Sequence, residues 1–265
     1  MNEPLFRLTV LGTRGSMAIC KKSHSLFGGD TSCYYVQAGE ESLFLDGGSG
    51  LLCAPTEFSR PPVILLTHLH LDHLLGLGMY PRLSRRGEQT QIFVPAPDEE
   101  GALSALDRLY RPPYWPLSLT AYAGDVRVKP LLPSFSVGVV QVQTLEGNHP
   151  GGCTVIRLQY AGKTLVYATD YERDEPSFTS LIGFAKGADL LLYDGQYVKE
   201  ELPAKRGFGH STAEDGIELM ERCGAKRLLI VHHDPGSTDE MLLEREARIH
   251  RPDVHYARAG GVFDL

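Results

Sequence analysis

The segment at residues 67–73, Thr-His-Leu-His-Leu-Asp-His, gathers three histidines and one aspartate directly after a short apolar run. Imidazole and carboxylate groups are the ligands that zinc, iron and manganese take in proteins. In an extended chain His68 and His70 share one face and can bind one ion, whereas Asp72 and His73 lie beyond a bend and can serve a second. The alternative is a polar surface loop or histidines satisfied in the core, but neighbouring unpaired imidazoles would then need other partners.

Three other places along the chain repeat this design, in which a ligand-type side chain follows an apolar, strand-like run. His149 follows residues 139–145, Asp170 follows residues 165–169, and His232 follows residues 228–231. A polar residue at the end of one strand is common. Its recurrence favours a shared site, because strand ends at the rim of a sheet can aim several side chains at one point.

The remaining pattern predicts the elements that position these residues. Alternating or apolar runs predict strands over residues 5–11, 34–37, 42–45, 63–67, 91–94, 137–144, 154–160, 164–168, 190–193 and 228–231. The capping pattern Ser211-Thr-Ala-Glu214 predicts a helix that ends near Gly224. Ser237 and Glu240 predict a second helix, which extends to about residue 250. Two groups of strands punctuated by helices predict a layered α/β domain.

The composition narrows the class of protein. The chain has 265 residues, a formal net charge of -7 and 42% hydrophobic residues, which suits a single globular domain over residues 1–265. Five scattered cysteines, no C-x-x-C pair and no signal-peptide pattern predict a cytoplasmic protein with reduced thiols. No apolar run approaches the roughly 20 residues of a membrane span. The acidic balance disfavours extended nucleic-acid binding.

The pattern His-x-His-x-Asp-His, followed by His149, Asp170 and His232, resembles the metallo-β-lactamase-fold metallohydrolase superfamily. The resemblance runs from residues 11–13 to His232 and implies a four-layer αββα sandwich with a dinuclear metal site at one edge. It implies a first ion held by His68, His70 and His149, and a second held by Asp72, His73 and His232, with Asp170 bridging both. It also implies that Asp46 supports the site without ligating. His233 would point the other way if the strand before it continues.

Further residues narrow the branch of the superfamily. Zinc β-lactamases usually carry cysteine at the place of Asp170, and flavodiiron enzymes usually carry glutamate at the place of His70 and an added flavin domain. The run Gly-His-Ser-Thr at residues 209–212 resembles the ribonuclease Z and cyclic-nucleotide phosphodiesterase branch, which implies a pair of Asp194 and His210. The chain departs from ribonuclease Z at residues 193–196, where Tyr-Asp-Gly-Gln replaces His-Glu-Ala-Thr. It also lacks room at residues 171–209 for the long arm that grips transfer RNA.

Two segments offer candidate substrate-binding residues. His210, Ser211 and Thr212 stand at the predicted start of a helix, where free N–H groups and the helix dipole attract a phosphate. The alternative is that Ser211 only caps the helix and His210 is a surface residue. Tyr114 and Trp115 lie in a proline-rich stretch and can form an apolar lip that stacks a base or an acyl group. The alternative there is a connecting loop packed on the core.

We therefore expect a hydrolase with two divalent ions, zinc first and manganese or iron as alternatives. A hydroxide held by both ions would attack a small cyclic or linear phosphodiester, with Asp72, Asp194 and His210 as catalytic residues. The alternatives are hydrolysis of a carboxylic ester, lactone or thioester on the same ions, and a non-catalytic metal-binding sensor. The expected partner is a small-molecule phosphodiester, with no membrane, and a homodimer is left open. Two ions would make the pocket positive despite the net charge of -7.

Overall fold

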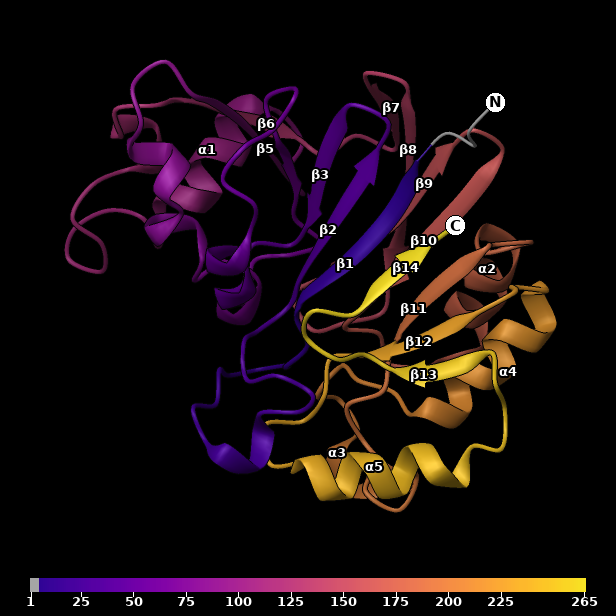
Figure 1. The fold of residues 1–265 in the computed structure, drawn as a ribbon. Helices are drawn as coiled ribbons and strands as arrows, with labels where there is room; N and C mark the ends of the chain where they lie inside the picture. The colour runs from indigo at the N-terminus through magenta and orange to yellow at the C-terminus, as the bar shows by residue number, and fades with distance from the viewer. Residues whose placement is uncertain (1–4) are drawn as a thin grey trace.

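Two mixed β-sheets stacked face to face form the centre of the fold in a computed structural model that describes residues 5–265 (Figure 1). The first sheet consists of β1 (Phe6–Gly12), β2 (Cys33–Ala38), β3 (Glu41–Leu45), β4 (Val63–Leu65), β5 (Gln89–Val94), β6 (Asp125–Pro130) and β14 (Val262–Asp264). The second consists of β7 (Ser134–Val137), β8 (Val140–Gly147), β9 (Cys153–Tyr160), β10 (Lys163–Ala168), β11 (Leu190–Asp194), β12 (Leu228–Val231) and β13 (Val254–Tyr256). Their orders are β14-β1-β2-β3-β4-β5-β6 and β13-β12-β11-β10-β9-β8-β7.

Each sheet contains a block of parallel strands. In the first sheet β3, β4, β5 and β6 run parallel, and in the second β10, β11, β12 and β13 do. Every residue of β3, β4, β11 and β12 is buried. This burial explains why β4 and β12 are continuous apolar runs rather than alternating ones. Within each block the carboxyl ends of the strands therefore open at one common edge.

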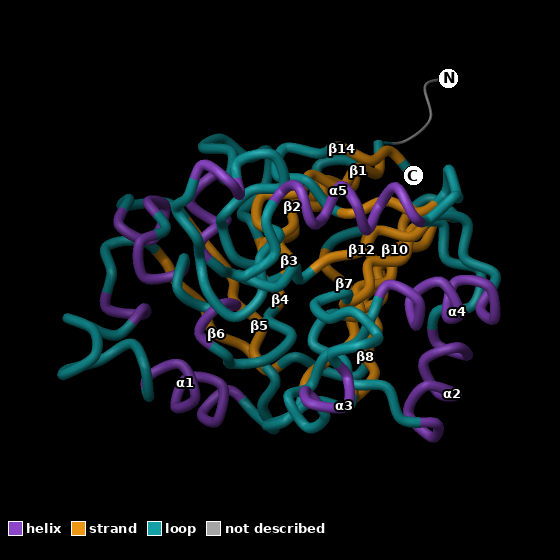
Figure 2. Tube along the Cα trace, turned by 90° about the horizontal axis from the view of Figure 1, so that it is seen from below, coloured by secondary structure: helices purple, strands orange, loops and turns teal. Residues whose placement is uncertain are grey.

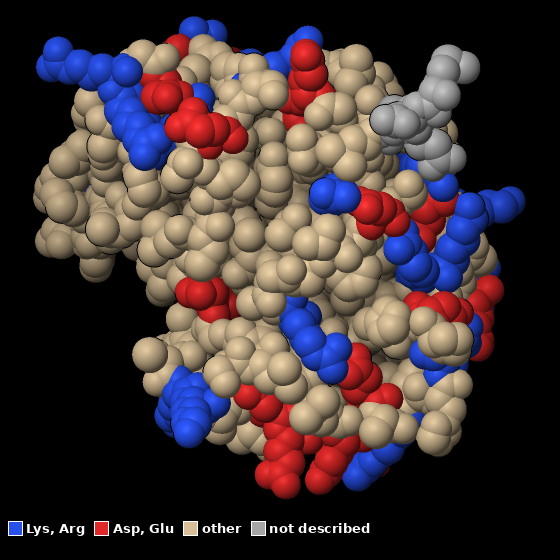
Figure 3. All heavy atoms as spheres, viewed as in Figure 1, with Lys and Arg blue, Asp and Glu red and all other residues tan. Residues whose placement is uncertain are grey.

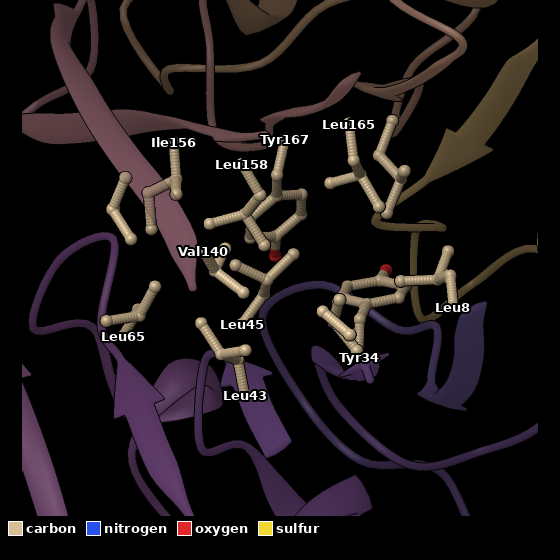
Figure 4. Packing of buried hydrophobic residues seen from close by; sticks show 14 of the residues in the cluster. Leu8, Tyr34, Leu43, Leu45, Leu65, Val140, Ile156, Leu158, Leu165 and Tyr167 are labelled. Carbon is tan, nitrogen blue, oxygen red and sulfur yellow. The ribbon is translucent and has the colours of Figure 1, made fainter. Parts of the chain in front are cut away.

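The core between the sheets is made of apolar side chains from both. Figure 4 shows Leu8, Tyr34, Leu43, Leu45 and Leu65 of the first sheet facing Val140, Ile156, Leu158, Leu165 and Tyr167 of the second. All of these side chains are almost completely buried. Because the interior is close-packed, the two sheets are held in a defined relation at the edge where their parallel strands end.

Helices cover the outer face of each sheet. Helix α1 (Glu99–Asp107) packs on the first sheet, and α2 (Glu175–Phe184) and α4 (Ala213–Cys223) pack on the second (Figures 1 and 2). Helix α5 (Asp239–Arg248) lies against β13. The short helix α3 (Leu202–Lys205) lies apart from α5, as Figure 2 shows. The order helix, sheet, sheet, helix confirms the predicted αββα sandwich. Among residues 5–265, no helix is long and apolar enough to cross a membrane.

Three local predictions were wrong. The single strand expected over residues 137–144 is two strands, β7 and β8, because Gly138 adopts a positive φ of 53° and reverses the chain. The caps of α4 and α5 are Thr212 and Thr238, one residue later than expected, because their hydroxyls accept the N–H groups of the first turn. Ser211 does not cap α4, since its hydroxyl donates to the Tyr171 carbonyl.

Candidate metal centre

Three residues of the candidate centre leave their strands in a left-handed backbone conformation. Asp46 follows β3 with φ 63°, Asp170 follows β10 with φ 48°, and His232 follows β12 with φ 61°. Side chains other than glycine seldom adopt this region, so each position is locally strained. The turn ends each strand and directs a buried polar side chain to the same edge of the sandwich.

The first group of converging ligand atoms comes from both sheets. His68, His70, His149 and Asp170 each place one ligand atom within 4.8 Å of the others. Nε2 of His68 lies 3.6 Å from Oδ2 of Asp170, and Nε2 of His149 lies 3.7 Å from the same oxygen. Nδ1 of His70 lies 3.1 Å from Nε2 of His149. Three imidazole nitrogens and one carboxylate oxygen thus face a common point.

The second group shares Asp170 with the first. Asp72, His73, Asp170 and His232 also place their ligand atoms within 4.8 Å of one another. Nε2 of His73 lies 3.2 Å from Oδ2 of Asp72 and 3.2 Å from Oδ1 of Asp170. Nε2 of His232 lies 3.1 Å from each of the same two oxygens. Asp170 directs Oδ2 to the first group and Oδ1 to the second, so its carboxylate can bridge two metal sites.

Unpartnered nitrogens show that this donor set fits metal ions. Nε2 of His68 is buried and has no hydrogen-bond partner within residues 5–265. Nε2 of His73 is also buried, and the atoms that face it are carboxylate oxygens of Asp72 and Asp170 at 3.2 Å. A buried nitrogen without a partner is costly, and a divalent cation at each point would supply one. Neutral imidazole and carboxylate are the donors that a divalent transition metal takes. The two groups therefore fit two divalent cations.

The pKa values of the candidate ligands shift in two directions. Burial lowers the pKa of His68, which favours the neutral imidazole that a metal binds. Burial would also lower the pKa of His232, but Asp170 and Asp72 outweigh it and raise the value to about 9. The pKa of Asp170 lies well below its usual value, because His232 and His73 outweigh its burial. Protons thus balance the carboxylates here, and bound cations would displace them.

Hydrogen bonds to the ring nitrogens that face away from the metal groups orient the candidate ligands. The buried carboxylate of Asp46 accepts from Nδ1 of His73 at 2.7 Å, from the Thr67 N–H at 2.7 Å and from the Tyr167 hydroxyl at 2.9 Å. Nδ1 of His149 donates to the Gly209 carbonyl at 2.8 Å. Such contacts fix the ring orientation and the tautomer of a metal-binding histidine. The structure therefore places Asp46 behind His73, outside the two groups.

Asp194 and His210 form the expected pair beside the two groups. Nδ1 of His210 lies 2.8 Å from Oδ2 of Asp194, and the carboxylate is fully buried. The His210 ring stacks on His232, with 4.9 Å between centroids, and meets His149 edge-on at 5.3 Å. Since Nδ1 donates to a carboxylate, Nε2 of His210 is the nitrogen left for a substrate.

Three of the other candidate substrate residues, Ser211, Thr212 and Trp115, form contacts away from the metal groups. The Ser211 hydroxyl accepts from the Tyr193 hydroxyl at 3.1 Å, and Thr212 caps α4. Trp115 donates its indole N–H to the Tyr122 hydroxyl at 2.9 Å and packs on the cluster beneath α1, as the connecting-loop alternative describes. Tyr114 is exposed. The structure thus brings His210, and not the hydroxyls of Ser211 or Thr212, to the metal groups.

His233 points away from the centre. Its Nε2 lies 2.8 Å from the Ala257 carbonyl, and its ring packs edge-on against Phe27. The neighbouring His232 turns to the metal groups because of its left-handed backbone. The two adjacent histidines are therefore directed to opposite sides, although the expectation assumed a continuing strand and β12 ends at Val231.

Gly15 and Ser16 also contact the centre, although nothing in the sequence pattern singled them out beyond a turn-rich loop. The Ser16 N–H donates to Oδ2 of Asp72 at 2.7 Å. A Cβ atom on Gly15 would lie 2.3 Å from the His232 ring, so no other residue fits there without moving that ring. Gly15 lies far from His232 in the chain, and only the fold brings them together.

The comparisons with known proteins agree with this geometry. Residues 48–233 match the family described as the beta-lactamase superfamily domain, and the chain belongs to that superfamily. A ribonuclease Z of Ignicoccus hospitalis is 28% identical over 257 residues, covering 81% of this chain and 85% of that protein. The crystal structure of the metallo-beta-lactamase fold protein YhfI from Bacillus subtilis superposes with a TM-score of 0.75 at 20% identity, covering 98% of this chain and 100% of that one.

A diphosphatase from the PhnP family also superposes, with a TM-score of 0.73 at 18% identity, covering 98% of each chain. These structural likenesses confirm the fold. With the named hydrolases among its relatives and two groups of ligands for divalent cations, the chain is a hydrolase of the dinuclear kind in this superfamily.

Proposed function

We propose that the protein is a zinc-dependent phosphodiesterase that acts on a small cyclic or linear phosphodiester. The observation that carries the proposal is the Asp194–His210 pair, whose imidazole ring and carboxylate lie directly beside the candidate ligand His232. A buried carboxylate that holds Nδ1 leaves Nε2 of His210 free to bind a phosphate oxygen or to give a proton to a leaving oxygen. The ribonuclease Z relatives, named for an RNA substrate, support phosphodiester chemistry.

Different residues of the chain would bind the ions, bridge them and donate a proton. Two divalent ions, zinc first and manganese or iron as alternatives, would supply an activated water and stabilise negative charge at phosphorus. His68, His70 and His149 would hold one ion, and Asp72, His73 and His232 the other. Asp170 would bridge both. His210 would protonate the leaving oxygen, and Asp194 would keep its ring in place.

A small substrate is favoured by the charge of the exterior. The formal net charge is -7, and Lys and Arg side chains alternate with Asp and Glu over the face in Figure 3. Long nucleic acids are held by continuous rows of cations that neutralise many phosphates. An interspersed, net acidic surface supports recognition of a single phosphodiester at the metal pocket instead.

The test compares two electrophiles on the same protein. The purified chain, loaded with zinc or manganese, is assayed with bis-p-nitrophenyl phosphate and with a lactone. We expect hydrolysis of the phosphodiester to exceed that of the lactone. We expect His210→Ala to reduce hydrolysis of a dialkyl phosphodiester, whose leaving oxygen needs a proton, at least tenfold. Faster lactone hydrolysis, unaffected by His210→Ala, would show that the carboxylic-ester alternative is correct. The control is His250→Ala, which removes an exposed histidine.

A further inference from the structure

Phe208 is a large exposed side chain held next to the candidate metal centre. The residues on both sides of it, Gly207 and Gly209, have positive φ values of 86° and 91°, and their N–H groups donate to the Glu172 carboxylate at 2.8 Å. The Gly209 carbonyl accepts from Nδ1 of His149 at 2.8 Å. The backbone is thus hydrogen-bonded to a candidate ligand, while Phe208 as a residue is 60% exposed.

A cation lies beside this ring. Nζ of Lys205 is 5.5 Å from the centroid of Phe208 and 5.3 Å from that of Tyr197, within range of a cation–π contact. Tyr197 in turn meets His210 edge-on, with 5.5 Å between centroids. A continuous path of side chains therefore leads from His210 through Tyr197 and Lys205 to Phe208.

The space along this path limits what can bind there. The cavity that His210 and Lys205 line has a volume of about 50 Å³, which is room for a few water molecules and not for an aromatic ring. A ring attached to the substrate would lie outside the cavity, against the open face of Phe208. There an acceptor on the ring can meet the ammonium of Lys205.

We propose that Phe208 and Lys205 form a subsite for the leaving group of the substrate, and that this group carries a heteroaromatic ring of the nucleobase kind. The proposal rests on the proposed function, in which His210 lies next to the leaving oxygen that it protonates. The leaving group then extends from His210 toward Lys205 and Phe208. Phe208 stacks on the ring, as aromatic side chains do on bases. Lys205 donates to a ring nitrogen or oxygen.

The experiment uses two substrates that differ only in the ring. One is a dinucleoside monophosphate whose leaving nucleoside carries adenine, and the other has an abasic sugar at that position. The leaving oxygen is the same in both, so the ratio of their kcat/KM values measures recognition of the base. Stacking predicts that the wild type prefers the adenine compound by roughly 5- to 150-fold.

Substitutions assign that preference. Phe208→Ala brings the ratio close to one, whereas Phe208→Trp retains the ratio. Lys205→Ala lowers the ratio, and Lys199→Ala, which removes an exposed lysine nearby, leaves it unchanged. A wild-type ratio near one, or a ratio that survives Phe208→Ala, overturns the subsite. Because the ring is exposed, the melting temperature of Phe208→Ala stays close to that of the wild type.

Binding of adenosine, followed by calorimetry, separates this subsite from the proposed function. Adenosine carries no phosphate, so its affinity does not require hydrolysis. If the wild type cleaves neither of these compounds nor bis-p-nitrophenyl phosphate, the proposed function is wrong, and calorimetry still tests the subsite. Adenosine that binds the wild type roughly 5- to 150-fold more tightly than Phe208→Ala supports the subsite. Equal affinities overturn it.

Discussion

Oδ2 of Asp194 lies 2.8 Å from Nδ1 of His210 and 3.8 Å from Nδ1 of His232, so one buried carboxylate faces a candidate catalytic histidine and a candidate metal ligand. The carboxylate is held in turn by the N–H of Gln196, which donates to Oδ1 at 2.9 Å. A fixed carboxylate selects the tautomer of the ring it contacts. Asp194 is thus placed to position His210 without touching a substrate.

Replacing Asp194 with asparagine should therefore impair proton donation by His210 more than the other parts of the reaction. We expect kcat to fall by about 100-fold for a phosphodiester with an alkyl leaving group, within the range that general acid catalysis contributes. A p-nitrophenyl leaving group needs little protonation, so its kcat should fall far less. Equal losses on both substrates would contradict the positioning role. Asp194→Glu should restore part of the rate.

Metal binding should be measurable without any substrate. Each ion would satisfy buried nitrogens, such as Nε2 of His68, which has no hydrogen-bond partner among residues 5–265. A ligand that binds only the folded state stabilises it, so a chelator should lower the melting temperature and added zinc should restore it. His68→Ala should reduce the metal content below two ions per chain, measured by elemental analysis. His250→Ala serves as the control. Metal content unchanged in His68→Ala would contradict the assignment.

Gly15→Ala should disturb the second group selectively. The added Cβ would lie 2.3 Å from the ring of His232, which must then move. We expect the metal content to fall from two ions toward one and hydrolysis to fall at least tenfold. Gly183→Ala in α2 is the matched control, because its Cβ meets nothing within 4 Å. Full metal content in Gly15→Ala would show that His232 does not hold an ion.

Asp189 links pH to stability at a point away from the centre. Burial would raise its pKa, but hydrogen bonds from the Lys226 ammonium at 2.7 Å and the Thr164 N–H at 2.8 Å outweigh burial and lower it. A carboxylate whose pKa is lowered in the folded state stabilises it above the unfolded pKa of about 3.9, and this stabilisation is lost as the pH falls.

Asp189→Asn should therefore lower the free energy of unfolding by about 1 kcal/mol at neutral pH, and the difference should shrink as the pH falls below about 4. Urea unfolding at a series of pH values measures this. Glu200→Gln, which removes an exposed carboxylate, should show neither effect. A difference that stays constant down to pH 3 would contradict the ion-pair explanation.

The sequence was most informative where a strand and a chemical group adjoin. Asp170 and His232 each follow a continuous apolar run, and that pattern reflects central strands with both faces buried. The pairing of Asp194 with His210 followed from the resemblance to ribonuclease Z, and the structure shows it. These features depend on strand ends that meet at one edge of the sheet. In a layered α/β fold, parallel neighbouring strands end at the same edge, so this arrangement can be predicted.

Features that depend on contacts between distant segments could not be predicted. The fit of Gly15 against His232 joins two ends of the chain, and nothing local to either residue signals it. Helix α1 begins at a polar Glu-Glu-Gly run with weak periodicity, and β14 is only 3 residues long. Thr212 rather than Ser211 caps α4, because the Ser211 hydroxyl donates a hydrogen bond to the Tyr171 carbonyl.

The candidate ligands are divided between the sheets. His68 and His73 follow a strand of the first sheet, whereas His149, Asp170 and His232 follow strands of the second. Neither half of the chain holds a full set for either ion, so ions can be captured only after the two layers have closed on each other. Metal uptake would therefore be a late event in folding, and the bound ions would link the two sheets by joining ligands from both.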